Sequence, residues 1–449
     1  GRIVGGAKYN RVVFNGNGLI SGNNTFKELI FAPTKTYNLI SGTNQTITGL
    51  FSTDTPQCGG WSAITSSTLG EQANITIAAG ANVVVSGVIM KDIKITGDKV
   101  FTANNSIDNG NNSGWIFPAY VGQNLYWVGG SGNWNDKAHW SQRSGETGNF
   151  CVPGPADDTF FDVNSGFKIS NKTITIDNTS YTHDITFLGN GQAPTLTQSG
   201  VQTLNIYGSS EWQTGMGTID VSNIYYRHTG EAKTIKSNGV KTGKEYLYFE
   251  EENKLDLSDD FYALAIYFHH NAGTWNTNNF RVDINRSFSK NSTKATTLNL
   301  GSSQIYLLNT YSEFNTTPLN TTVNAGISHI HFPFLTSANG MNSNGLISRV
   351  NQIYYDVTFE GPFGRIVGGA KYNRVVFNGN GLISGNNTFK ELILAPTKTY
   401  YLVSSNTQTI TGLFSADTPQ CGGWSAITSF TAGEQANISI TAGANVVVS

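Results

Sequence analysis

The chain has 449 residues, of which only 13% are charged, and its 28 basic residues nearly balance its 30 acidic ones. This balance supplies no basic surface for nucleic acid or an anionic membrane, so we expect neither partner. No apolar run is long enough to cross a bilayer, and direct membrane insertion is not expected. Aromatic residues reach 12% alongside 50 glycines, which favours an ordered all-β protein with many turns.

One stretch of the chain occurs twice. Residues 1–86 return as residues 364–449, without a gap and with 11 differences in the 86 positions. The differences include Phe31/Leu394, Asn38/Tyr401, Ser67/Phe430 and Leu69/Ala432. A copy this close predicts a tandem array with a period of 363 residues, of which the chain holds one unit and the start of the next.

Short alternating runs of apolar and polar residues follow one another from the first residues onward, as at 11–14, 26–31, 172–178, 203–208, 245–250 and 263–268. Each run is bounded by Gly, Asn, Asp or Pro, which is typical of strands and their turns. No segment longer than about ten residues keeps the period of 3.6 that an amphipathic helix requires. We therefore expect little helix.

Triplets that end in phenylalanine recur at intervals of 17 to 19 residues, although some gaps are longer. Their last residues are Phe14, Phe31, Phe187, Phe249, Phe268, Phe332, Phe359 and Phe377. A strand at this interval predicts an elongated parallel β-solenoid, in which each turn stacks its apolar residues on the turn below. A string of β-sandwich domains is the alternative, because it also gives frequent short strands.

The repeat and the solenoid together predict which positions face inward. Phe14, Phe31 and Phe377, with Leu394, are expected to be stacked core positions, because the exchange of Phe31 for Leu394 is one that a core tolerates. The exchanges Asn38/Tyr401 and Ser67/Phe430 change polarity, so we expect both positions to face outward.

Changes in residue composition along the chain suggest the domain organisation. Residues 1–117 form the end module of one repeat unit, 118–125 are a linker, and 126–363 are a Trp-rich start followed by coils. Residues 364–449 then begin the next unit. The three cysteines, Cys58, Cys151 and Cys421, permit one disulfide per unit but do not fix its pairing.

The Trp-rich start suggests a ligand site. Trp127, Trp134 and Trp140, with Asp136 among them, could form an aromatic platform on which a sugar ring lies while the carboxylate binds its hydroxyls. The alternative is that the indoles cap or fill a small core, since solenoid arrays require capping.

Acidic clusters and histidine pairs are weaker candidates for metal binding. Acidic clusters at Asp157, Asp158 and Asp162 and at Asp256, Asp259 and Asp260 lack calcium-loop spacing, and turn roles are the simpler interpretation. The histidine pairs 269/270 and 329/331 show no third metal ligand. We assign no cofactor, no metal and no catalytic residue.

Three runs, at residues 23–49, 101–115 and 126–162, resemble the repeats of giant cell-surface adhesins of Bacteroidota. These adhesins are exported by the type IX secretion system, and the SprB-like gliding-motility adhesins belong to them. The resemblance covers nearly the whole 363-residue unit. It implies an extracellular filament on the bacterial cell surface that grips surfaces or polysaccharides, and that meets the gliding and secretion machinery through regions outside this chain.

We therefore expect a structural and adhesive segment and not an enzyme. The alternative is a lyase or hydrolase that acts on polysaccharides from a β-helix scaffold. Such an enzyme needs carboxylates on adjacent coils of one groove, and Glu250, Glu251 and Glu252 beside Asp256 come closest.

Overall fold

The computed structural model of the chain describes residues 1–53, 60–68, 70–189, 192–227, 231–250, 254–336, 345–416 and 423–448. They fall into two compact units, Gly1–Gln192 and Ala193–Ser449. The regular structure is almost entirely strand, and the helices within these ranges are two short 3-10 segments. No helix among them is long and apolar enough to span a membrane.

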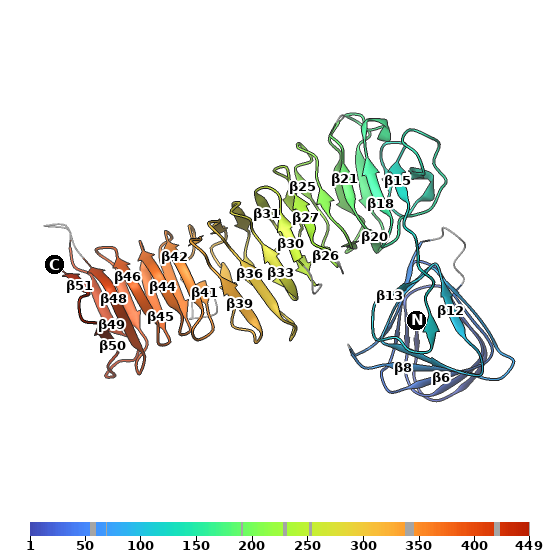
Figure 1. Cartoon of the computed structure of the whole chain (residues 1–449), viewed down its shortest axis with the longest axis horizontal. Coiled ribbons are helices and arrows are strands. Elements are labelled where there is room, and N and C mark those ends of the chain that lie inside the picture. The colour runs from blue at the N-terminus through green and yellow to red at the C-terminus, as the bar shows by residue number, and fades with distance from the viewer. Residues whose placement is uncertain are drawn as a thin grey trace. The chain divides into compact units, whose positions relative to one another are not determined.

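The first 117 residues wind into stacked turns (Figure 1). One column is a six-stranded parallel sheet of β1 (Arg2–Ile3), β3 (Gly18–Ile20), β5 (Thr36–Leu39), β7 (Ser62–Ser66), β10 (Val88–Lys91) and β13 (Ile107–Asp108). The rest is an eight-stranded sheet of β2 (Lys8–Phe14), β4 (Asn24–Phe31), β6 (Asn44–Thr53), β8 (Ala73–Ile77), β9 (Asn82–Ser86), β11 (Ile93–Thr96), β12 (Phe101–Asn104) and β14 (Trp115–Ile116).

The long strands of the second sheet bend to serve two sides of the coil. The register between β4 and β6 shifts between Phe26 and Glu28, so one extra residue turns the strand there. In the next turn the two halves are separate strands, because β6 pairs with both β8 and β9.

The rest of the first unit holds the Trp-rich segment. It contains β15 (Asn124–Trp127), β16 (Gly132–Asn133), η1 (Lys137–His139), β17 (Trp140–Ser141), β18 (Asp158–Phe161), η2 (Val163–Ser165), β19 (Thr173–Ile176), β20 (Ser180–Thr182) and β21 (Ile185–Phe187). β15 pairs with β17 in antiparallel fashion and with β18 in parallel. Of the expected linker, residues 118–123 have no regular structure, and residues 124–125 already belong to β15.

The second unit begins with β22 (Thr195–Gln198) and then forms three parallel columns. One contains β24 (Ser210–Glu211), β27 (Lys233–Lys236), β30 (Lys254–Leu257), β33 (Gly273–Asn276), β36 (Thr296–Asn299) and β39 (Thr321–Asn324). Another contains β23 (Thr203–Ile206), β26 (Asn223–Tyr226), β29 (Tyr246–Phe249), β32 (Tyr267–His270), β35 (Ser287–Ser289), β38 (Glu313–Asn315), β41 (Gly345–Ile347), β43 (Phe363–Val367), β45 (Asn380–Ser384), β47 (Thr399–Leu402) and β49 (Ala426–Ser429).

The third column of this unit is a 12-stranded parallel sheet. Its strands are β25 (Thr218–Ile219), β28 (Lys241–Thr242), β31 (Phe261–Ala263), β34 (Val282–Ile284), β37 (Gln304–Leu307), β40 (His329–His331), β42 (Ile353–Phe359), β44 (Lys371–Phe377), β46 (Thr388–Leu394), β48 (Thr407–Ala416), β50 (Asn437–Ile440) and β51 (Asn445–Val448). These columns confirm the predicted parallel β-solenoid and not the sandwich alternative.

The second copy of the repeat continues the stack of the unit before it. β42 is the last strand that lies wholly within the first 363 residues, and β44 belongs to the copy. The two strands pair in register, from Ile353 opposite Lys371 to Phe359 opposite Phe377. The boundary in the sequence is therefore not a break in the ladder. The proposed division into domains remains a prediction.

The predicted core positions are confirmed. Phe14 lies opposite Phe31, and Phe377 lies opposite Leu394, and all four side chains are buried. The ring of Phe359 stacks on Phe377 with centroids 4.7 Å apart. Apolar residues thus align from turn to turn, which is how a solenoid buries its core.

The predicted outward positions are also confirmed. Tyr401 is exposed between the buried Tyr400 and Leu402, and Phe430 is exposed as well, with the two rings in edge contact at 6.3 Å. In the first copy Asn38 is half-buried and its amide oxygen accepts a hydrogen bond from Thr65. The polarity changes at these two positions therefore lie on the outer face of the coil.

Equivalent residues of the two copies differ in burial at the last turn. Trp61 is 8% exposed and Trp424 is 94% exposed, while Ile64 is 0% exposed and Ile427 is 39% exposed. The cause is coverage: the Tyr120 ring packs on Trp61 at 5.2 Å, and β7, which carries Ile64, lies between β5 and β10. Among the described residues, β49 pairs with β47 alone, so its other edge is uncovered in this chain.

We expect this edge to exchange its amide hydrogens much faster than the first copy does, because β49 and β50 each pair on one side only within the described part of the chain. Hydrogen exchange followed by mass spectrometry can separate the copies, since peptides that include Ser67 or Phe430, and Thr76 or Ser439, differ in mass. Equal protection of the two sets of peptides would contradict the arrangement.

Candidate functional site

The three predicted sugar-binding tryptophans lie in the core of the first unit. Trp127, Trp134 and Trp140 are each 0% exposed. Trp140 packs edge-to-face on the other two indoles at 5.1 Å, and Phe161 lies within 6 Å of all three. Their ring faces are covered, so the predicted carbohydrate platform is wrong and the packing alternative holds.

Polar contacts of this segment also serve structure. The indole N–H of Trp127 donates to the carbonyl of Gly130, and that of Trp140 to the carbonyl of Trp134, both at 2.7 Å. Asp136, the fourth predicted residue, is exposed and caps η1 by accepting from the Ala138 N–H at 2.9 Å. Capping accounts for a carboxylate at this position.

The acidic cluster beside it consists of turn and cap residues. Asp157 is buried and accepts from the Tyr120 hydroxyl and the Gln123 N–H at 2.9 Å each, and burial raises the pKa of its carboxyl above the ordinary value. Asp162 caps η2 through a capping box with Ser165. These hydrogen bonds support the turn interpretation.

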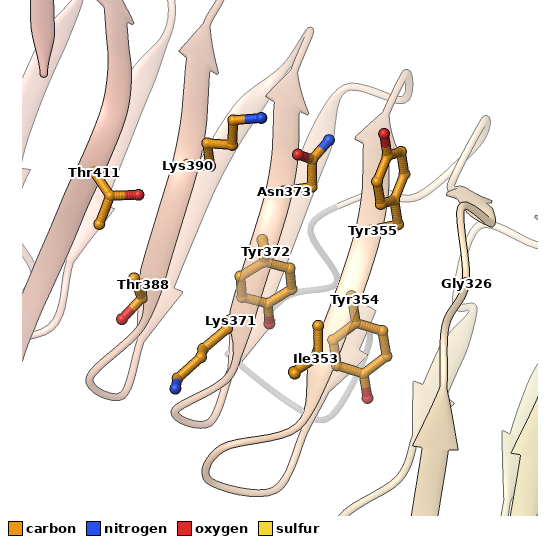
Figure 2. Close-up of a pocket in the computed structure, with 10 residues that line it drawn as sticks. All are labelled: Gly326, Ile353, Tyr354, Tyr355, Lys371, Tyr372, Asn373, Thr388, Lys390 and Thr411. Atoms are coloured by element: carbon orange, nitrogen blue, oxygen red, sulfur yellow. The ribbon is translucent and has the colours of Figure 1, made fainter.

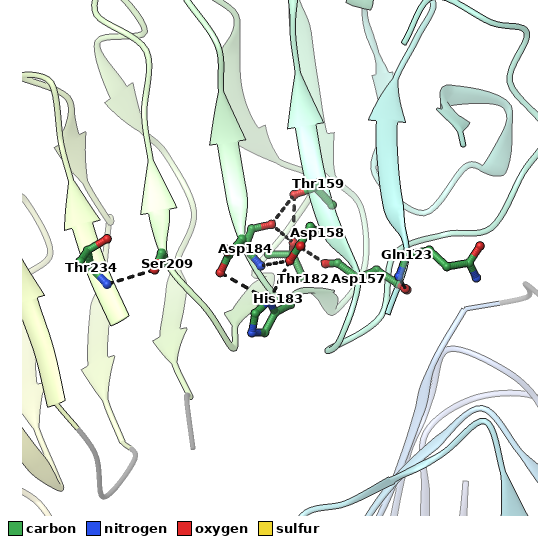
Figure 3. Close-up of polar contacts among 9 residues, drawn as sticks. All are labelled: Gln123, Asp157, Asp158, Thr159, Thr182, His183, Asp184, Ser209 and Thr234. Carbon is green, nitrogen blue, oxygen red and sulfur yellow. Dashed lines mark hydrogen bonds and ion pairs between the residues drawn. The ribbon is translucent and has the colours of Figure 1, made fainter. Parts of the chain in front are cut away.

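One group of possible metal ligands was missed in the sequence. Oxygen or nitrogen atoms of Asp158, His183 and Asp184 lie within 4.8 Å of one another (Figure 3). His183 Nδ1 is 2.7 Å from an Asp158 carboxylate oxygen that also accepts from the Asp184 N–H at 3.0 Å. The chain separates Asp158 from His183 by one turn of the coil, so no local motif marked the group. Its mutual contacts hold the turn together.

The second acidic cluster also binds its own turns. Asp259 accepts from the N–H groups of Ser237 and Asn238, and Asp260 accepts from the Arg281 N–H. The Asp256 carboxylate lies 2.9 Å from the Lys254 amine. Glu250 pairs with Arg227 at 2.8 Å, and Glu251 and Glu252 lie outside the described residues.

The histidine pairs are engaged within the protein. His329 contacts the Thr358 hydroxyl at 2.7 Å, and His331 lies between Glu360 and Gln304 at 2.6 and 2.9 Å. His270 points into the core and is buried, and this burial lowers its pKa to about 3. Cys151 is disulfide-bonded, whereas Cys58 and Cys421 lie outside the described residues.

A cavity of about 370 Å³ lies on the outer face of the solenoid where the two repeat units meet (Figure 2). We call it the junction pocket. β42 supplies Ile353, Tyr354 and Tyr355 from the end of one unit, and β44, β46 and β48 supply the next unit's part. The full lining is Gly326, Ile353, Tyr354, Tyr355, Lys371, Tyr372, Asn373, Thr388, Lys390 and Thr411.

The pocket lies over the strands that carry Tyr354 and Tyr372. These two side chains are buried on the inner side, where their rings stack at 5.6 Å. Ile353 and Tyr355 remain exposed beside them. Side chains of a strand alternate between its two faces, so Ile353 and Tyr355 point outward on either side of the inward Tyr354. The sequence did not reveal the pocket, since it requires the register across the boundary.

Comparisons with known proteins give no relative. No family model, no curated protein and no solved structure matches the chain. The function proposed below therefore rests on this chain's own residues and on the resemblance noted in its sequence.

The buried imidazole of His270 predicts acid sensitivity. The unfolded chain takes up this proton near the ordinary pKa of about 6.5, whereas the folded chain does so only near pH 3. The unfolded state thus binds more protons in this window, and the free energy of unfolding falls with decreasing pH by up to about 1.4 kcal/mol per pH unit.

Urea unfolding of the full chain at several pH values measures this effect. In the variant His270→Gln, we expect the free energy of unfolding to fall less steeply below about pH 6.5 than in the wild type. Contributions from other titrating groups cancel in the comparison. Parallel pH profiles of the two proteins would show that folding does not lower the pKa of His270.

Proposed function

We propose that the chain is a structural and adhesive segment of a long extracellular filament on a bacterial cell surface, which attaches to surfaces or polysaccharides during gliding. The observation that carries the proposal is the unbroken ladder at the repeat boundary, where Phe359 and Phe377 stack although they belong to successive units. A unit whose end accepts the start of the next is built for extension.

The geometry of the coil suits this role. Each turn adds about 4.8 Å, the spacing of neighbouring strands, and covers the core of the turn before it. A tandem array extends by repeating this step and needs no new fold at each unit. The resemblance to type IX-exported adhesins supports the same role, with the secretion and gliding machinery acting through regions outside this chain.

Differences between the copies support an adhesive surface. At buried positions the copies exchange Phe31 for Leu394 and Thr53 for Ala416, whereas outward positions gain the aromatic rings of Tyr401 and Phe430. Exposed aromatic side chains are common at binding surfaces. Repeats of this kind can present several surfaces on one scaffold.

Adhesion of beads coated with the chain tests the proposal. Under flow over glass carrying a panel of neutral and acidic polysaccharides, we expect retention of these beads and not of beads coated with the urea-unfolded chain. Equal loss of both kinds of bead from every surface would contradict the adhesive role.

The same panel tests the enzymatic alternative. We expect no release of reducing or unsaturated sugars during incubation of the chain with each polysaccharide. Product release would instead favour a lyase or hydrolase on the β-helix scaffold.

A further inference from the structure

The junction pocket exists only where one repeat unit meets the next. The second copy contributes two lysines, Lys371 and Lys390, whose counterparts in the first copy are Lys8 and Lys27. In the second copy β42 lies beside β44, the strand that begins with Lys371. In the first copy the equivalent strand is β2, which begins with Lys8, and among the described residues it pairs with β4 alone. The pocket is thus a composite of two units.

The lysines give the pocket unpaired positive charge. Among the described residues, neither the Lys371 nor the Lys390 amine makes an ion pair or a hydrogen bond. The carboxylates nearby are engaged, because Glu391 lies 3.7 Å from Arg374 and Asp356 accepts from the Asn373 amide at 2.9 Å. Two free ammonium groups at a concave surface favour an anionic ligand.

The remaining groups suit a sugar ring. Tyr355 is exposed on the same outer face and contacts no other aromatic ring among the described residues, so its ring is available to the C–H face of a pyranose. The side chains of Thr388 and Thr411 line the pocket. The Thr411 hydroxyl donates to the Phe389 carbonyl at 3.2 Å and can still accept from a sugar hydroxyl. Apolar contact with a few polar groups is usual in ligand pockets.

The positions of the lysines point to a polymer. In Figure 2 the amines of Lys371 and Lys390 point toward opposite ends of the lined area, with Tyr372 between them. A single small anion at one amine would leave the other without a partner. A polymer that carries negative charge on successive sugars reaches both.

We propose that the junction pocket binds an acidic polysaccharide of the polyuronate class, and that a tandem array forms one such site at each unit boundary. This inference rests on the proposed adhesive function and names the ligand class for one site. Valency then grows with the number of boundaries, which strengthens attachment without a new contact.

Calorimetric titration of the full chain with polygalacturonate tests the site, with neutral galactan as the comparison polymer. The variant Lys371→Gln/Lys390→Gln should bind polygalacturonate about tenfold more weakly, as expected for lost charge-assisted contacts. The matched variant Lys8→Gln/Lys27→Gln removes the same charges from the copy without β42, and its affinity should change less than about twofold. Tyr355→Ala should also weaken binding, although it retains both lysines.

Each outcome decides between interpretations. Equal losses in the two lysine variants would show diffuse charge attraction and overturn the site, as would equal binding of galactan and polygalacturonate. If the wild-type beads adhere under flow and Lys371→Gln/Lys390→Gln leaves polygalacturonate binding unchanged, the pocket proposal fails and the adhesive role stands. If wild-type beads adhere to nothing, the adhesive role itself fails.

Discussion

Each inward side chain of this solenoid must stack on the corresponding side chain of the next turn, and the rest of the structure depends on this constraint. The ladder of Tyr354, Tyr372 and Phe389 illustrates it, with ring centroids 5.6 and 5.2 Å apart. Parallel strands hold these partners in register, and a shift by one residue would turn every inward side chain outward. The constraint fixes alternate residues and leaves the others free.

The constraint also extends to buried polar groups. In the first copy the Asn24 amide donates to Gln45 at 2.9 Å, and in the second copy Asn387 donates to Gln408 at 3.0 Å. Buried amides are costly unless paired, so both members of each pair must be kept together. The copies therefore repeat this buried amide pair, although the buried Thr53, which bonds the Ser86 backbone, is replaced by Ala416 in the second copy.

Sequence patterns predicted the solenoid because its core is a repeated local pattern, and Phe14, Phe31 and Phe377 were found in the expected stack. The same patterns could not predict which side chains of different turns contact one another. The composition around Trp127 is compatible with a sugar platform and with a packed core, and only the three-dimensional arrangement shows the rings covered. The junction pocket and the contact of Asp158 with His183 likewise depend on register between distant residues.

Continuity of the ladder across the repeat boundary can be measured with pairs of engineered cysteines. Ile353 lies opposite Lys371, and Lys371 lies opposite Thr388, so Ile353 is one turn from the first and two from the second. A disulfide needs Cα atoms about 4.4 to 6.8 Å apart, which fits neighbouring strands and not strands two turns apart. Peptide mapping under non-reducing conditions should find a bond in Ile353→Cys/Lys371→Cys and none in Ile353→Cys/Thr388→Cys. A bond in the second variant, or none in the first, would contradict an unbroken in-register ladder between the units.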